Sequence, residues 1–257
     1  MLSSFLIDSF TLLFVVAIGV IYWTMDKEKG FHLQLLLAAS IFLNHIIHEF
    51  TATIDAPSLE GTWYKDLLYP NLWTQNLTIL IGALRFETGR LKTTMLSGII
   101  ISVILLLAIT FFETNIISII SGLLFGIFLV IALYRQEEWM NELLDRDRLL
   151  LMIFVPFIFW AIHPTQTTSI VCGYILGAGV GYQLEAIKLR MILRGPFLKK
   201  IGATSIGIIG VIVILFIFSR SMSNPFSLFL CYLSLGLWTY YLAPFVFIKS
   251  RLYRYID

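Results

Sequence analysis

Long apolar runs recur along this chain at close to the length that spans a membrane. A helix needs about 20 apolar residues to cross about 30 Å of hydrocarbon. Such runs follow one another here with only short polar or charged connections between them. Only 13% of the 257 residues are charged, about half the share found in an ordinary soluble domain. These features exclude a soluble single domain and a disordered chain, and they predict an all-α polytopic transmembrane helix bundle.

The apolar runs predict about nine spans. Their expected bounds are 5–24, 31–50, 71–86, 94–112, 115–134, 149–163, 167–184, 202–219 and 226–248. An odd number of spans places the two termini on opposite sides of the membrane. If the N-terminus lies outside, 16 of the 18 basic residues fall on the inner side, and only Lys65 and Arg220 remain outside. Because basic loops stay in the cytoplasm, the sequence predicts a multi-pass cell-membrane protein with a cytoplasmic C-terminus.

Charge and cysteine content exclude several function classes. The net charge is only +2, so nothing favours a nucleic-acid partner. Two cysteines, Cys172 and Cys231, exclude a disulfide scaffold and a four-cysteine zinc site. Both lie within apolar segments, where cysteine is ordinarily a small buried hydrophobe. We expect no cofactor.

Polar side chains gather in two places where a site would be expected. The third span opens with amides and hydroxyls that include Gln75 and Asn76, and such groups either face a cavity or join helices inside a bundle. The second span carries His45, His48 and Glu49 on one helical face. That spacing suffices for part of a metal site, whose further donor would be Asp66, Glu113 or His163. The sequence does not select among these three, so no metal is expected and mutual hydrogen bonding is preferred.

Three other segments are interpreted through helix packing and contact with the membrane surface. The glycines of the seventh span predict close helix packing and not a phosphate loop, because no strand precedes them; they are Gly173, Gly177, Gly179 and Gly181. Residues 135–148 mix both charge signs and predict a solvated helix at the cytoplasmic surface. The stretch 188–200 is purely basic and suits anionic headgroups of the inner leaflet, or ordinary topology determination. Its cations are Lys188, Arg190, Arg194, Lys199 and Lys200.

The last 90 or so residues carry a recognisable pattern. It comprises the glycine-rich segment 173–185, the turn Arg194-Gly195-Pro196, and the run 235–239 followed by Ala243-Pro244. In these features the chain resembles bacterial membrane phosphatases of the type 2 phosphatidic acid phosphatase (PAP2) family, in the branch with a hydrophobic C-terminal extension. The resemblance implies a phosphatase-like helical core over 1–134 and a membrane extension over 135–257.

The same resemblance implies that the three catalytic motifs are degenerate. The first motif falls on His48 through Asp55, which puts an anion where the family has its phosphate-binding arginine. The second falls on Pro70 to Trp73, so an indole replaces the acid/base histidine. The third places Thr114 and Ser118 at the nucleophilic histidine and its orienting carboxylate. Phosphoryl transfer through a covalent intermediate needs those groups.

The expected function is therefore that of a phosphatase-like membrane protein without hydrolase activity. It would act as a partner subunit, scaffold or lipid-binding module at the outer face, with Gln75, Asn76, His45 and Glu49 as candidate ligand contacts. The implied partners are membrane lipids, polyprenyl or phospholipid, and another membrane protein. Two alternatives stay open: a transporter or lipid flippase component, and an enzyme with an active site rebuilt around His45, His48, Asp55, Asp66 and Trp73.

Overall fold

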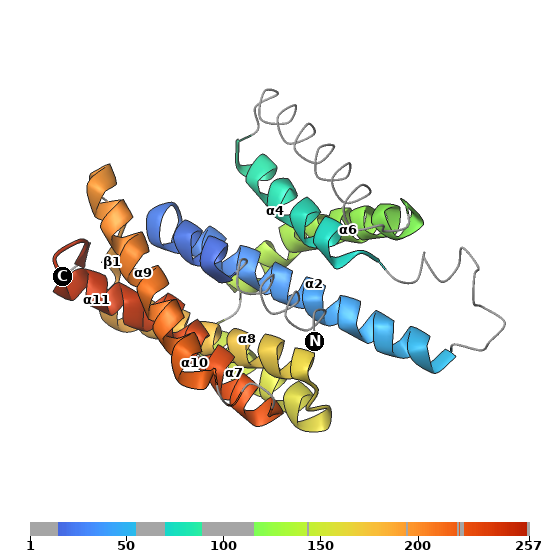
Figure 1. Ribbon diagram of the computed structural model, residues 1–257. Coiled ribbons are helices and arrows are strands. Elements are labelled where there is room, and N and C mark those ends of the chain that lie inside the picture. The colour runs from blue at the N-terminus through green and yellow to red at the C-terminus, as the bar shows by residue number, and fades with distance from the viewer. Residues whose placement is uncertain are drawn as a thin grey trace. The chain divides into compact units, whose positions relative to one another are not determined.

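Helices make up nearly all of the described chain, which divides into two compact units (Figure 1). The computed structural model describes residues 15–54, 70–88, 116–142, 144–193, 195–219, 221 and 224–255. One unit combines residues 1–34 with 141–257, and the other comprises residues 35–140. Helix α2 (Lys27–Ile54) contributes its first turns to the former and the remainder to the latter.

The unit that contains both chain ends is built mainly from the C-terminal helices. The helix Val15–Thr24 comes first. After it come the beginning of α2, then α7 (Asp145–Ile162), α8 (Gln166–Leu184), α9 (Phe197–Phe218), α10 (Pro225–Leu237) and α11 (Ala243–Lys249). Short π-helical turns, η2 (Glu185–Leu189) and η3 (Trp238–Leu242), follow α8 and α10. Helix α8 packs against both α7 and α10.

The second unit is a smaller set of helices. It contains the C-terminal part of α2, α4 (Leu72–Thr88) and most of α6 (Ile116–Glu142). Helix α6 continues through residues 135–142 without a break, so this part of the charged segment 135–148 is helical and extends α6. Its place at the cytoplasmic surface stays a prediction. Residues 135–142 contain no proline or glycine that would end a helix. The backbone is extended at Leu144, which has a ψ of 143°.

Among the described residues, four helical segments are long and apolar enough to cross a membrane. They are Lys27–Glu49, Gln166–Leu189, Phe197–Phe218 and Pro225–Lys249, with shorter apolar helices at Val15–Thr24 and Ile116–Ala132. The helical fold with candidate membrane-spanning helices is thus confirmed, whereas the count of nine spans and the orientation remain predictions. The expected span 94–112 lies outside the described residues.

Glycines let α8 and α10 approach closely, as the sequence predicts. A Cβ at Gly173 would collide with the carbonyl of Phe229, and one at Gly177 with that of Leu233. From the other side, a Cβ at Gly236 would lie 2.5 Å from the backbone nitrogen of Ala178. This is the small-residue packing that membrane helices use, because lipid gives helices no hydrophobic reason to associate.

A proline explains why η3 binds the first helix. The backbone N–H of Ala243 bonds to the carbonyl of Trp238, and Pro244 has no N–H to offer the carbonyls that follow. The freed carbonyl of Thr239 accepts the indole N–H of Trp23 at 2.8 Å. The carbonyl of Tyr240 accepts the Tyr22 hydroxyl at 3.4 Å. The helix Val15–Thr24 is thereby fixed to the C-terminal region.

A two-stranded antiparallel ribbon lies within the basic region, which the all-helical expectation missed. Strand β1 (Met191–Ile192) pairs with β2 (Arg254–Tyr255), with Ile192 opposite Arg254. Each strand has two residues, too few for the period-two alternation by which a strand is recognised in a sequence. The ribbon brings the end of the chain beside the segment that follows η2.

Candidate functional site

The beginning of α4 meets α6 in the second unit, and this meeting point includes positions that the PAP2 resemblance singles out. The backbone N–H of Asn71 donates to the carbonyl of Ser118 at 2.9 Å. The Asn71 side chain accepts the backbone N–H of Thr74 at 3.1 Å, as a helix N-cap does. Segments that correspond to the second and third motifs therefore lie in direct contact.

Helix α2 joins the same place through Asn44. Its side-chain amide donates to the carbonyl of Pro70 at 2.8 Å and to Oε1 of Gln75 at 3.1 Å. His48 is one helical turn further along α2 and is half-buried. Pro70 is buried, whereas Trp73 is 39% exposed at the start of α4. Asp55 and Thr114, also singled out by the resemblance, lie outside the described residues.

Amides and a hydroxyl form a buried network just inside this meeting point. The Ser40 hydroxyl donates to Oδ1 of Asn76 at 2.5 Å, and Nε2 of Gln75 donates to the Ser40 hydroxyl at 2.9 Å. Ser40, Gln75 and Asn76 are at most 1% exposed. These amides bond to other helices of their unit, which favours the interpretation of helix-joining groups over that of cavity-lining groups.

Two glycines of α6 allow α4 to come this close. A Cβ at Gly122 would collide with the Thr74 hydroxyl, and one at Gly126 would lie 2.7 Å from Cβ of Thr78. Buried amides need partners at short range because lipid offers none. The glycines thus allow α4 to pack closely on α6, while the amide network joins α4 to α2.

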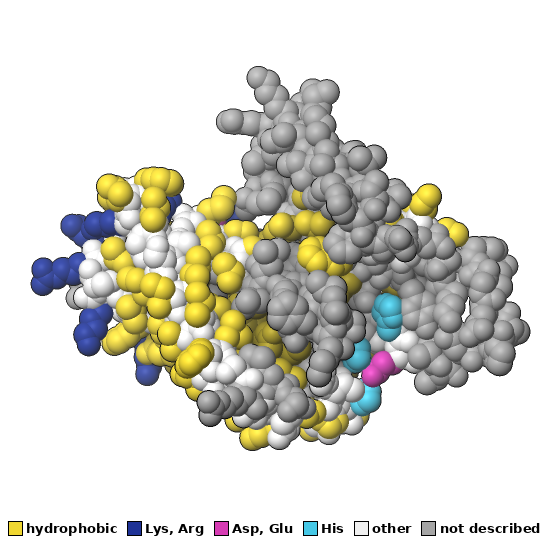
Figure 2. Space-filling model, viewed as in Figure 1, with side chains coloured by type: hydrophobic (Ala, Val, Ile, Leu, Met, Phe, Trp, Pro, Cys, Tyr) yellow, Lys and Arg dark blue, Asp and Glu magenta, His cyan; other side chains and the backbone are white. Residues whose placement is uncertain are grey.

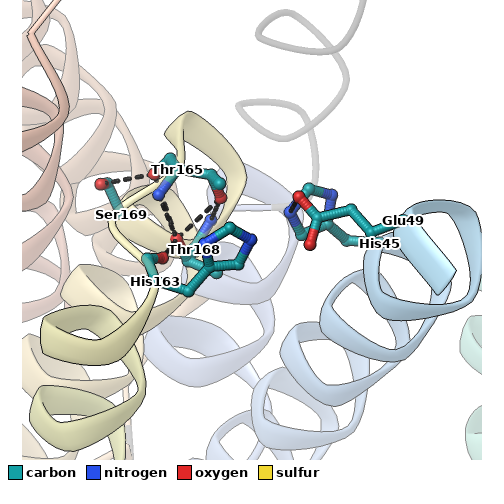
Figure 3. A network of polar contacts seen from close by, with 6 residues as sticks. All are labelled: His45, Glu49, His163, Thr165, Thr168 and Ser169. Carbon is teal, nitrogen blue, oxygen red and sulfur yellow. Dashed lines mark hydrogen bonds and ion pairs between the residues drawn. The ribbon is translucent and has the colours of Figure 1, made fainter. Parts of the chain in front are cut away.

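His45 and Glu49 form a separate pair on α2. Nε2 of His45 lies 3.4 Å from Oε1 of Glu49, and Figure 3 shows the two side chains facing each other one turn apart. Among the described residues, no three His, Cys, Asp or Glu side chains come together in a way that could hold a metal ion. The pair is an i, i+4 contact of the kind that stabilises a helix by a few tenths of a kcal/mol.

A polar cluster in the other unit closes the turn between α7 and α8. The Thr168 hydroxyl donates to the carbonyl of His163 at 2.5 Å, and Thr165 and Thr168 exchange side-chain to backbone bonds as a capping box (Figure 3). The Ser169 hydroxyl donates to the carbonyl of Thr165 at 2.7 Å. This network satisfies backbone groups at a helix start and leaves His163 exposed.

The last third of the chain also matches a known family. Residues 169–255 match the family model described as PAP2 superfamily phosphatase, transmembrane extension. This segment is similar to a PAP2 transmembrane extension. No curated protein and no solved structure matches the chain. The matched segment begins in α8 and ends in β2, so it includes the α8–α10 glycine contact, and the match supports a PAP2-like membrane family.

A buried ion pair between the matched segment and the start of α2 was not predicted from the sequence. Glu185, only 1% exposed, follows the last residue of α8 and lies 3.0 Å from the Lys27 ammonium. Its Oε1 also accepts the backbone N–H of Met191 at 2.7 Å, and Oε2 lies 3.5 Å from the Tyr22 hydroxyl. The available signal was a lone acidic residue at the end of an apolar span, and sequence alone could not name its partner across 158 residues.

The expected basic segment is partly exposed and partly used in packing. Lys188, Arg190 and Lys199 are exposed, and Arg194 lies outside the described residues. Lys200 is half-buried and donates to the carbonyl of Thr24 at 2.6 Å, which caps the end of the first helix. Lys200 is therefore a structural residue, whereas Lys188, Arg190 and Lys199 lie at the surface.

Proposed function

We propose that this chain is a PAP2-like membrane protein that does not transfer phosphoryl groups. It serves as a partner subunit, scaffold or lipid-binding module at the outer membrane face. The proposal rests on the contact between Asn71 and Ser118, because the motif segments that meet there carry Trp73 and Ser118 in place of a histidine and a carboxylate. The polar groups whose bonds define this meeting point are neutral amides, hydroxyls and backbone groups.

The chemistry of the family explains why such a site would be inert. A histidine nucleophile, a carboxylate that orients it, a proton donor for the leaving alkoxide and cations for the phosphate oxygens are all needed. A single electrostatic donor is worth about 10²–10³ in rate. An indole at position 73 neither donates a proton to an alkoxide nor carries charge. Asp55, where the resemblance places an arginine, would repel a phosphate.

A hydrolysis assay tests the loss of activity. The purified full chain in detergent is offered phosphatidate, phosphatidylglycerophosphate and undecaprenyl diphosphate, and phosphate release is compared with a heat-treated sample. No release above that control is expected. Turnover that disappears in His48→Ala but persists in His163→Ala would contradict the proposal and establish an active site rebuilt around the second span.

A second experiment tests the role as subunit or lipid-binding module. The chain is purified from its native membrane by affinity, and bound protein and lipid are identified and counted by mass spectrometry. A second membrane protein at fixed stoichiometry, or a lipid whose retention falls in Trp73→Ala, is expected. Phe216→Ala is the matched control, because Phe216 is 79% exposed on α9. Lipid flux in reconstituted vesicles that is lost in Gln75→Leu would favour a transporter instead.

A further inference from the structure

Five exposed cations from separate parts of the sequence gather where the chain ends. The β1–β2 pairing places the C-terminal strand beside the segment after η2, and Figure 2 shows Lys and Arg side chains together over this region with no Asp or Glu drawn among them. We refer to these residues as the basic surface; they are Lys188, Arg190, Lys199, Arg251 and Arg254.

Specific contacts hold the basic surface in place. The Lys199 ammonium donates to the carbonyl of Arg251 at 3.2 Å, which ties the first turn of α9 to the chain segment before β2. The hydroxyl of Tyr253 donates to the carbonyl of Trp23 at 2.8 Å. The cations therefore project from a fixed part of the fold and not from a loose terminus.

The backbone is strained at two of these cations. Arg190 has a φ of 43° and Arg251 a φ of 59°, and they are the non-glycine residues with positive φ in the described part of the chain. Glycine or asparagine adopts this conformation more easily than arginine. Arginine at both positions indicates that the side chain, and not the turn alone, has a role there.

Charge on the basic surface is not neutralised by the described carboxylates. Glu185 pairs with Lys27, and Asp26 with Lys29. Of the five cations, none forms an ion pair with another described residue. The surface therefore presents a net positive charge to whatever lies next to it.

Apolar side chains stand beside these cations. Ile187 is 63% exposed, Phe197 is 77% exposed and Leu198 is 80% exposed. Ile187 precedes Lys188, and Phe197 and Leu198 precede Lys199 in the first turn of α9. Apolar side chains interleaved with Lys and Arg are typical of protein segments at the boundary between headgroups and acyl chains.

We propose that the basic surface binds the phosphodiester headgroups of anionic phospholipids in the cytoplasmic leaflet. The cations contact headgroup oxygens, while Ile187, Phe197 and Leu198 insert at the top of the acyl region. Charge complementarity and the adjacent spanning helix α9 favour a lipid over a soluble anion. The basic surface includes no residue of the PAP2 motif segments. Lipid binding there is therefore independent of whether the chain hydrolyses phosphate esters.

Lipid titration of the purified full chain tests the proposal. Phosphatidylglycerol and phosphatidylcholine are titrated in detergent, and bound lipids are counted by native mass spectrometry. The test variant is Arg190→Asn with Arg254→Gln, in which asparagine suits the positive φ. The matched control is Lys29→Gln with Arg146→Gln, which also removes two exposed cations. The test variant is expected to weaken phosphatidylglycerol binding about tenfold, whereas the control leaves it unchanged.

Several results would overturn this inference. They are equal affinity for the two lipids, equal loss in both double variants, and no loss in the test variant. Displacement of phosphatidylglycerol by glycerol phosphate at similar concentration would show an anion site that needs no lipid. If the test variant unfolds at a lower temperature than the control, Lys188→Gln with Arg251→Asn replaces it, because these changes keep the Lys199 bond to the backbone carbonyl of residue 251 and asparagine suits the positive φ there. The same tenfold loss is expected.

Sidedness is tested separately with Lys188→Cys. A membrane-impermeant maleimide is expected to label this cysteine in inverted membrane vesicles and not in intact cells. The two native cysteines are buried and provide the background. Labelling in intact cells would place the basic surface outside and would contradict the assignment to the cytoplasmic leaflet.

Discussion

The Lys27 ammonium lies 3.0 Å from Oε1 of Glu185, so the start of α2 is bonded to the residue at which α8 ends. Glu185 is 1% exposed, and its carboxylate also accepts the backbone N–H of Met191. The matched PAP2 extension therefore packs against residues near the N-terminus, although the family match itself begins only at residue 169.

Replacing Lys27 alone is expected to lower the free energy of unfolding more than replacing Lys27 and Glu185 together. Lys27→Met leaves a buried carboxylate without its cation, and such a loss typically costs about 3–5 kcal/mol. Lys27→Met with Glu185→Met is expected to be closer to the wild type than Lys27→Met alone. Unfolding in detergent, followed as a double-mutant cycle, measures the coupling. Additive losses would show that the two side chains do not interact.

The glycine contact between α8 and α10 makes a second prediction. Gly177→Ala directs a methyl group at the carbonyl of Leu233, so the helices must separate and unfolding should occur at lower temperature. Gly202→Ala is the matched control in α9, since its nearest neighbour would lie 3.5 Å away. There alanine is expected to stabilise by about 0.5–1 kcal/mol through helix propensity. Thermal unfolding of both variants checks the contrast.

The helices of the extension were predictable because each depends on local signals. Apolar length predicts α8 to within one residue at its start, whereas α9 begins five residues before the expected span 202–219. The glycines of α8 predict its close packing. The identity of that partner was not predictable, since contact between Gly177 and Leu233 depends on how two helices meet in space. The family pattern in the last 90 residues was also visible, and the match over residues 169–255 confirms it.

Contacts between residues far apart in the sequence were not predictable either, because they depend on how the elements meet in space. The sequence predicts that the amides of the third span face either protein or a cavity. Their hydrogen bonds with Ser40 and Asn44 in the structure favour protein. The β1–β2 ribbon is set by tertiary position and not by strand propensity, which is weak over two residues. The sequence indicates that Pro244 leaves a helix carbonyl without its usual donor, but not that the indole N–H of Trp23 donates to the carbonyl of Thr239.

Tyr253 gives a prediction about alkaline pH. Burial raises the pKa of Tyr253, whose hydroxyl donates to the carbonyl of Trp23 at 2.8 Å. Because the folded pKa exceeds the unfolded value of about 10, the stabilising contribution is complete below about pH 10 and is lost as the pH rises through the raised folded value. Tyr253→Phe should therefore be less stable than the wild type near pH 7 by about 1 kcal/mol.

The difference between wild type and Tyr253→Phe should shrink as the pH rises above about 10. Unfolding of both proteins in detergent, followed across pH 7 to 12 by circular dichroism, measures it. A constant difference across that range would show that the hydroxyl does not titrate in the folded protein, and no difference at neutral pH would show that its bond contributes nothing.

The network around Gln75 makes the last prediction. Gln75→Leu removes the acceptor of the Asn44 amide and the donor to Ser40, so buried polar groups on α2 lose a partner, at a cost of about 1–3 kcal/mol. Asn44→Leu leaves the carbonyl of Pro70 without this donor. Because both changes break the same bond, the double variant should lose less than the sum of the single losses. Additive losses, or a lipid flux abolished while stability is unchanged, would instead show that these amides serve a transported ligand and not the joining of helices.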